Sequence, residues 1–398
     1  MKRREALKVL GGLAAPLLAQ RRLPNLIVLY ADDMGWSDVG FNGRKEWNTP
    51  NLDRLAAQGT IFDRWYTGMP LCAPSRACLL TGKHTIHHGV RNNATDLPVE
   101  EVTLAEALKP LGYKCALFGK WHKGVLPGGG FTHPMDQGFD ETFGYLDARH
   151  AWEHFPKTLF RGRGSVPVEG YSADMMANES LRFMRENRNN PFFLYVPFIE
   201  PHFLIEAPEE EVNRYKGRFP EKDPREPHNA RYAAMIHRLD AQVGRILQGL
   251  DDLQLSGDTI VFFSSDNGAT FEAGNKGAAN YHDSNRPFRG QKRSLEEGGI
   301  RMPACLRWPG NVPAGKRSED PMHMTDIMPS FLAAAGSSPE AAWKVDGRNM
   351  LDVWTAKAPA PERTLFWEFN VEGWNMYAAM RGDCELSVRL LGFPVCNF

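Results

Sequence analysis

Four short apolar runs along the chain share one pattern, an aromatic or β-branched stretch that stops abruptly at polar residues. Each run predicts a strand buried on both faces, because a continuous apolar run of this length bounded by polar residues suits an interior position in a sheet. The runs are residues 25–30, ending in Ala31-Asp32-Asp33; 114–118, ending in Gly119-Lys120-Trp121-His122; 191–198, ending in Glu200-Pro201-His202; and 259–264, ending in Ser265-Asp266-Asn267-Gly268.

Helical patterns lie between these runs. Residues 52–58 follow a Thr49-Pro50 start signal, and residues 232–250 carry an apolar stripe at helical spacing. Strands that alternate with helices predict an α/β fold, with a mostly parallel central sheet flanked by helices. Ligands bind outside the carboxyl ends of the strands in such sheets, so we expect the four polar clusters to converge on one site.

Composition excludes several classes of protein. The chain has 398 residues, 42% of them hydrophobic and 24% charged, as is typical of a globular protein. A formal net charge of −1 gives no global basic field for holding nucleic acid. No apolar stretch approaches the roughly 18 residues of a membrane helix, so we expect no stable membrane insertion. Six cysteines are too few for a disulfide scaffold, and Cys78, Cys115 and Cys305 are expected to be small buried residues.

The amino-terminal segment predicts an export signal over residues 1–20. Met1-Lys2-Arg3-Arg4 forms a charged start, and a short, weakly apolar stretch leads to Ala19. The paired arginines favour a twin-arginine signal, and an ordinary Sec signal is the alternative. Either signal predicts an exported protein, periplasmic or extracellular, from a bacterium.

The polar residues at two strand ends suit a metal ion. Asp32, Asp33, Asp266 and Asn267 offer only hard oxygen ligands, which fit Ca²⁺ or Mg²⁺ and do not fit zinc or copper. Taken singly, each of these motifs could instead be a turn or a helix cap. Their shared position at strand ends favours the metal site.

Cys72 is a candidate reactive residue. The segment from Cys72 to Gly82 predicts a loop that enters a helix, which places Cys72 near the helix amino terminus. The backbone N–H groups and the helix dipole there favour an anion and are expected to lower the pKa of the thiol. The alternative is a small buried hydrophobic side chain.

The motif Cys72-x-Pro74-Ser75-Arg76, followed by Leu80-Thr81-Gly82, resembles the signature of the type I, formylglycine-dependent sulfatases, the arylsulfatase branch of the alkaline phosphatase superfamily. Five further segments resemble that family in the same order, so the likeness runs from about residue 24 to residue 355. They are residues 25–33, 119–122, 201–202, 265–268 and 289–292. The resemblance implies an alkaline phosphatase-like fold, a catalytic domain over 24–355 and a small C-terminal subdomain over 356–398.

The resemblance also implies an activity, the hydrolysis of a sulfated carbohydrate or an aryl sulfate with release of inorganic sulfate. Cys72 would be converted to Cα-formylglycine by a formylglycine-generating or an anaerobic sulfatase-maturing enzyme, and the hydrated aldehyde would attack sulfur. The implied catalytic residues are Cys72, Arg76, Lys120, His122, His202 and Lys292. The implied ligands of Ca²⁺, with Mg²⁺ as an alternative, are Asp32, Asp33, Cys72, Asp266 and Asn267.

Loops over residues 126–133, 149–168 and 216–229 are expected to rim the pocket, with Trp152, His154 and Arg161 as candidate substrate contacts. Two readings compete with the sulfatase. One is a phosphate or phosphonate monoester hydrolase of the same superfamily, and the other is a non-catalytic protein that binds sulfated glycans.

The C-terminal subdomain departs from the family. Residues 364–369 and 374–381 predict the first strands of a small antiparallel sheet, but the tail from about residue 384 resembles nothing in the family. We therefore expect a partial, truncated subdomain that has lost an edge strand. The exposed edge would present unpaired backbone and apolar surface, and would lower stability or cause aggregation.

Overall fold

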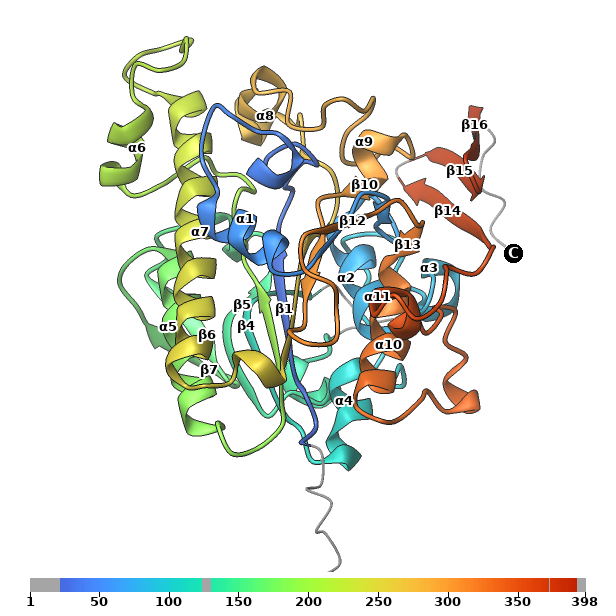
Figure 1. Ribbon diagram of the computed structural model, residues 1–398. Helices are drawn as coiled ribbons and strands as arrows, with labels where there is room; N and C mark the ends of the chain where they lie inside the picture. The colour runs from blue at the N-terminus through green and yellow to red at the C-terminus, as the bar shows by residue number, and fades with distance from the viewer. Residues whose placement is uncertain (1–21, 124–129, 372, 392–398) are drawn as a thin grey trace, which may run out of the picture.

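The computed structural model describes residues 22–123, 130–371 and 373–391. A mixed sheet lies between two layers of helices, and a small sheet packs beside them near the C-terminus (Figure 1). In spatial order the strands of the large sheet are β12 (Lys316–Ser318), β2 (Thr60–Phe62), β11 (Cys305–Arg307), β9 (Thr259–Ser265), β1 (Asn25–Ala31), β8 (Phe192–Pro197), β4 (Lys114–Lys123), β5 (Glu141–Asp147), β6 (Thr158–Arg161) and β7 (Gly164–Pro167).

The four strands predicted from the apolar runs are neighbours at the centre of this sheet. β9, β1, β8 and β4 all run parallel, and antiparallel pairs occur only toward the two ends. Alternate residues of β1 enter two different cores: Leu26 and Val28 face one helical layer, and Ile27 and Leu29 face the other. Burial on both faces explains the continuous apolar run.

Helices cover both faces of the sheet. One layer contains α1 (Pro50–Ala57), α5 (Ser172–Glu186), α6 (Glu209–Tyr215), α7 (His228–Asp252) and α8 (Ala278–Tyr281). The other contains α2 (Cys72–Thr81), α4 (Leu104–Leu108), α10 (Ile327–Ala334) and α11 (Leu351–Trp354). The helices predicted over 52–58 and 232–250 are confirmed as α1 and α7. Two short helices, α3 (Thr85–His88) and α9 (Glu297–Ile300), lie toward the small C-terminal sheet (Figure 1).

Two small sheets complete the fold. One joins β10 (Arg301–Met302), β3 (Trp65–Tyr66) and β13 (Met322–His323), and the other joins β14 (Thr364–Val371), β15 (Trp374–Arg381) and β16 (Cys384–Leu391). The second sheet packs its inner face, which includes Trp367 and Phe369, against Tyr66 and Ile300. The indole Nε1 of Trp367 donates a hydrogen bond of 2.7 Å to the carbonyl of Thr67. This contact ties the small sheet to the segment that leads into α2.

The expectation of an exposed edge on the second strand of this sheet was wrong. β16 pairs with β15 along its whole length, from Arg381 opposite Cys384 to Trp374 opposite Leu391. The turn before β16 contains Gly382 at φ +60°, a conformation that glycine adopts easily. Because ladder hydrogen bonds join backbone groups, a tail without the family's residues can still add a strand. The domain boundary near residue 355 stays a prediction.

The predicted export signal, residues 126–129 of the predicted rim and the last seven residues of the tail lie outside the described residues. In the part of the chain that is described, no helix combines the length and the apolar character needed to cross a membrane. Cys78, Cys115 and Cys305 are buried free thiols, as predicted.

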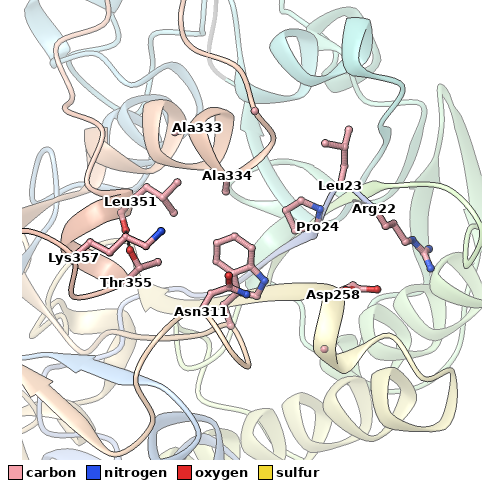
Figure 2. Close-up of a pocket in the computed structure, with 13 residues that line it drawn as sticks. Arg22, Leu23, Pro24, Asp258, Asn311, Ala333, Ala334, Leu351, Thr355 and Lys357 are labelled. Carbon is pink, nitrogen blue, oxygen red and sulfur yellow. Dashed lines mark hydrogen bonds between the residues drawn. The ribbon is translucent and has the colours of Figure 1, made fainter. Parts of the chain in front are cut away.

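A cavity of about 330 Å³ opens at the amino ends of β1 and β9. Figure 2 shows Leu23 and Pro24, which precede β1, on one side of it and Leu351 and Thr355 on the other. Asp258, just before β9, also lines it. The polar clusters follow the opposite, carboxyl ends of these strands, so this cavity is separate from the predicted site.

The backbones of β4, β5 and β8 approach one another unusually closely just before Lys120. A Cβ atom added to Gly119 would lie 2.0 Å from the carbonyl oxygen of Pro197, and one added to Gly144 would lie 2.1 Å from the carbonyl oxygen of Gly119. Gly119 has a φ of +141°, which side chains rarely tolerate. Glycine at positions 119 and 144 allows the close spacing of these strands, which places Lys120 in the site.

We predict that Gly119→Ala destabilises the protein by at least about 3 kcal/mol, since it combines backbone strain with a clash against Pro197. Gly112→Ala is the matched control: Gly112 also has a positive φ, +84°, but a Cβ there meets nothing within 4 Å. It should cost about 1 kcal/mol, from backbone strain alone. Urea unfolding measures both, and equal midpoints for the two variants would contradict the argument.

Candidate active site

All the predicted site residues converge at the carboxyl ends of the central strands, and each is at most 5% exposed. Asp32 and Asp33 follow β1, Asp266 and Asn267 follow β9, and His202 follows β8. Lys120 and His122 lie within β4, which continues further than predicted. Cys72 and Arg76 lie on the first turns of α2, and Lys292 comes from the loop before α9.

Hydrogen bonds donated by backbone amides tie the end of β1 to the ends of β8 and β9. The amide of Asp32 donates to the carbonyl of Glu200 after β8, at 3.1 Å. The amide of Asp33 donates to Oδ1 of Asp266 after β9, at 3.0 Å. Asp33 has a φ of +61°, a left-handed conformation that aspartate tolerates better than most residues. The turn therefore directs two consecutive carboxylates into one space.

Each buried carboxylate has a cationic partner from a different element. Oδ2 of Asp32 lies 2.6 Å from Nζ of Lys120, and Oδ2 of Asp33 lies 2.8 Å from Nζ of Lys292. These four side chains contribute two ion pairs to the centre of the site.

Arg76 supplies the third pair. One of its terminal nitrogens lies 2.8 Å from Oδ2 of Asp266 and 3.3 Å from Oδ1 of Asp32. The other donates to the carbonyl of Lys120 at 3.3 Å. Arg76 is buried and links α2 to both acidic strand ends.

The pKa values of the carboxyl groups follow from this arrangement. Burial alone would raise the pKa of Asp32, but the positive charges of Lys120 and Arg76 outweigh burial and hold this pKa well below its usual value. Burial and the neighbouring charge of Asp32 raise the pKa of Asp266 to about 7. Asp32 and Asp266 thus differ sharply in how readily they carry a negative charge.

Cys72 begins α2, as predicted, and its Sγ lies 3.5 Å from Oδ1 of Asp32 and 3.9 Å from Oδ1 of Asp33. The expectation of a lowered thiol pKa was wrong. Burial raises the pKa of Cys72 well above its ordinary value, and the charges of Asp32 and Asp266 act in the same direction. The helix dipole does not outweigh the effect of burial on this pKa. The unmodified side chain of Cys72 is therefore a neutral thiol beside the carboxylates of Asp32 and Asp33.

One group of side chains in the described part of the chain is arranged to hold a metal ion. It consists of Asp32, Asp33, Cys72 and His202, whose ligand atoms lie within 4.8 Å of one another. Asn267 adds a further oxygen: its Nδ2 donates to Asp33 at 2.7 Å, while its buried Oδ1 has no hydrogen-bond partner. An orphaned buried oxygen beside carboxylates fits a hard cation such as Ca²⁺ or Mg²⁺.

Asp266, one of the predicted ligands, lies outside this group. Its two carboxylate oxygens face Arg76 and the amide of Asp33. The structure therefore brings Asp266 beside the metal-ligating group but directs it toward its own partners.

The two histidines differ in their hydrogen bonding. Nδ1 of His202 donates to the carbonyl of Phe203 at 2.7 Å, and Nε2 lies 3.5 Å from Oδ2 of Asp33. Both ring nitrogens of His122 are buried without a partner, and its φ is +75°. Burial lowers the pKa of each imidazole well below its ordinary value, so both rings are neutral at pH 7.

The sequence did not indicate a buried network behind His202. Glu200 is fully buried; one of its carboxylate oxygens accepts from Ser172 and lies 3.4 Å from Nδ1 of His154. Nε2 of His154 lies 3.0 Å from the carbonyl of His202 and donates to it. His154 supports the loop that carries His202, so the expectation that it contacts substrate was wrong.

The other two predicted contacts differ in their surroundings, and Trp152 stays a candidate. Arg161 forms an ion pair with Glu179 of α5, at 2.6 Å. Trp152 packs its ring against Phe203, beside the site. Glu200 follows a predicted strand and precedes His202 in the sequence, but its support of His154 is visible only in the three-dimensional contacts.

The comparisons with known proteins agree with this geometry. The sequence profile of the sulfatase family matches residues 24–337. The chain is 35% identical over 378 residues to N-acetylgalactosamine-6-sulfatase of Canis lupus familiaris, covering 86% of this chain and 67% of that protein. It is 32% identical over 382 residues to arylsulfatase A of Homo sapiens, covering 88% and 71% respectively. The chain thus spans about two thirds of the length of these relatives.

Solved structures give the same result. The crystal structure of Ps i-CgsB superposes with a TM-score of 0.82 at 30% identity, covering 92% of this chain and 83% of the other. A second structure of that protein is a complex with k-i-k-neocarrahexaose, with a TM-score of 0.80, 30% identity and coverage of 90% and 83%. The extent of the family match, together with a site built at the expected strand ends, establishes that this chain belongs to the sulfatase family, whose members hydrolyse sulfate esters.

Proposed function

We propose that this sulfatase releases inorganic sulfate from a sulfated carbohydrate, with Cys72 as the precursor of the nucleophile. The observation that carries the proposal is the position of Cys72, buried at the amino end of α2 between two carboxylates and close to three buried cations. The relatives support a carbohydrate substrate, since one is named for a sulfated N-acetylgalactosamine and another was solved with an oligosaccharide. An aryl sulfate would suit the same chemistry.

A divalent cation fits the acidic group. Asp32, Asp33, Asn267 and the modified Cys72 would hold Ca²⁺, or Mg²⁺, and Asp266 would complete the negative charge around it. The bound cation would supply Lewis acidity that polarises the sulfate group and favours ionisation of the hydrate. The hard oxygen donors support this choice of metal.

The cations of the chain would bind the sulfate. Lys120 and Lys292 place their ammonium groups beside Asp32 and Asp33, where they can contact the peripheral sulfate oxygens. The fixed fork of Arg76 would orient the hydrated aldehyde at residue 72, since both belong to the first turns of α2. Such fixed charges stabilise the negative charge that develops on oxygen in the transition state.

The chemical steps require an aldehyde at position 72. One hydroxyl of its hydrate gives its proton to the neutral ring of His122 or His202, and its oxygen attacks sulfur. An oxygen–sulfur bond forms, and the bond between sulfur and the leaving oxygen breaks. The imidazolium formed in this way gives its proton to the leaving alkoxide, and the ring, neutral again, accepts the proton of the second hydroxyl. The second hydroxyl then gives up its proton, sulfate departs as the carbon–oxygen bond breaks, and water hydrates the regenerated aldehyde.

We also propose that the chain is exported and matured. The charged and weakly apolar segment over residues 1–20 favours export to the periplasm or beyond. A formylglycine-generating or anaerobic sulfatase-maturing enzyme would act on the unfolded segment around Cys72, because that residue is fully buried once the chain has folded. If export follows the twin-arginine route, which carries folded proteins, maturation precedes export.

We predict that an aldehyde replaces the thiol of Cys72 when the chain is expressed together with a formylglycine-generating enzyme. Mass spectrometry of the tryptic peptide spanning residues 65–76 detects the change. Cys72→Ala should abolish sulfate release, while Cys78→Ala is the control, because Cys78 is buried on the same helix but contacts His88 and no site residue. An unmodified thiol, in cells that convert a known sulfatase, would support the non-catalytic glycan binder.

The phosphatase alternative is tested by comparing one aryl alcohol esterified as sulfate and as phosphate. We predict that kcat/KM is at least about 100-fold higher for the sulfate, a difference of about 2.7 kcal/mol in transition-state stabilisation. A preference for the phosphate ester would assign the chain to phosphoryl transfer instead.

Removal of the metal should lower both activity and melting temperature, because it leaves buried carboxylates with less positive charge. Asn267→Ala should raise the Ca²⁺ concentration needed for half-maximal stabilisation by about tenfold. Asn275→Ala is the matched control, since Asn275 is equally buried but accepts a hydrogen bond from Ala279 in α8. Calcium titrations followed by thermal melting test both variants, and an identical calcium response would exclude Asn267 as a ligand.

A further inference from the structure

Two cavities adjoin the site on the side of Lys292. The first, of about 460 Å³, is lined by Lys292 itself, by Phe271 and Glu272, and by Phe369 of the C-terminal sheet. The second, of about 780 Å³, shares Phe271 and Glu272 with the first. On the opposite side, next to Arg76, the corresponding space is only about 20 Å³. Among these cavities, the one beside Lys292 has the room for a bulky group attached to a bound sulfate, next to Phe271 and Glu272.

The second cavity lies between two loops, one before α7 and one before α8. Pro220, Glu221, Lys222, His228 and Asn229 line it from the first loop and the start of α7. Ala273, Lys276, Gly277 and Tyr281 line it from the second loop and α8. Its volume is that of a site for a small molecule or a sugar residue.

The acidic groups that line this cavity are already engaged. The carboxylate of Glu221 accepts hydrogen bonds from the amides of Asn229 and Ala230, at 3.0 and 2.9 Å. The carboxylate of Glu272 lies 3.0 Å from Arg293 and 3.7 Å from Lys292. The cations Arg293 and Lys292 offset the charge of Glu272, and the two backbone amides hold the carboxylate of Glu221 in place.

The two lysines that line the second cavity are accessible to a ligand. Lys222 and Lys276 are exposed, and no described acidic side chain forms an ion pair with either of them. Burial lowers the pKa of the neighbouring His228, and the positive charge of Lys276 acts in the same direction. The lining therefore holds two lysines without an acidic partner among the described residues, and two carboxylates that contact other groups.

The loop that carries Lys276 is held in a defined conformation. Lys276 has a φ of +56°, and its amide donates to the carbonyl of Ala273 at 3.1 Å. The buried Oδ1 of Asn275 accepts from the amide of Ala279 at 2.7 Å. Tyr281, whose side chain is 46% exposed, adds an aromatic surface to the same lining. A lysine beside an accessible ring suits a charged sugar.

We propose that this second cavity binds a second anionic group, a sulfate or a carboxylate, on the glycan whose target sulfate ester occupies the Cys72 site. The inference rests on the proposed function and narrows its substrate to polyanionic glycans. Lys222 and Lys276 contact the second anion, and Phe271 and Glu272 lie beneath the sugar between the two groups.

The test uses two substitutions at exposed positions, Lys222→Ala and Lys276→Ala, combined in one variant. Lys216→Ala with Lys316→Ala is the matched control, because it removes the same charge from two exposed lysines that do not line the cavity. Binding is measured by calorimetry in a Cys72→Ala background, so that no turnover occurs, with a heparin-derived hexasaccharide as the probe.

We expect the Kd for the hexasaccharide to rise roughly tenfold in the Lys222/Lys276 variant and to stay unchanged in the control. In the active protein, kcat/KM for 4-nitrophenyl sulfate, which carries a single sulfate, should be the same in both variants. Equal Kd values in the variant and the control, or no binding of the hexasaccharide to the parent, would overturn the inference.

These outcomes separate the inference from the proposed function. If binding of the hexasaccharide depends on the two lysines but the protein releases sulfate from no ester, the second anion site is supported and the sulfatase activity is contradicted. If the protein releases sulfate but the two lysines have no effect on binding, the sulfatase activity is supported and the second anion site is contradicted.

Discussion

The structure of the site depends on one electrostatic constraint, that three buried carboxylates lie within a few ångströms of one another. Asp32, Asp33 and Asp266 cannot all be charged in such a place without compensating cations, because the desolvation of each ion is costly. The compensation comes from Lys120, Lys292 and Arg76, which arrive from a strand, a loop and a helix. The ion pairs therefore join parts of the chain that are far apart in sequence.

This constraint explains how the fold and the chemistry are connected. Parallel strands bring the acidic residues to one edge, and the close packing of glycines in β4 and β5 places Lys120 beside them. Three cations face three carboxyl groups, so the site carries no excess of negative charge. When a divalent cation joins them the site gains two positive charges, enough to bind a sulfate ester, which carries one negative charge.

Much of this arrangement could be predicted from the sequence. Apolar runs that end in polar residues identified the four central strands and the edge where they meet, because strand periodicity and burial are local properties. The site residues beyond the acidic ends came from a motif resemblance, and the structure brings all of them together. The family match supports the enzyme class, while the individual roles of Lys120, His122 and their neighbours stay predictions.

Other features could not be predicted, because they depend on contacts between distant segments. The direction of the thiol pKa at Cys72 is set by burial beside Asp32, and the helix terminus visible in the sequence favours the opposite direction. The support that Glu200 and His154 give to the His202 loop arises only after folding. The pairing of β16 with β15 requires no recognisable sequence, since backbone groups make the bonds.

The central claim is that the metal and the sulfate bind to one charge-balanced site. It is tested most directly by titrating inorganic sulfate into the Cys72→Ala protein with and without Ca²⁺, using calorimetry. The account predicts that Ca²⁺ tightens sulfate binding at least about tenfold, because binding at the two sites is linked through Lys120 and Lys292. Equal sulfate affinity in calcium and in chelator would contradict it.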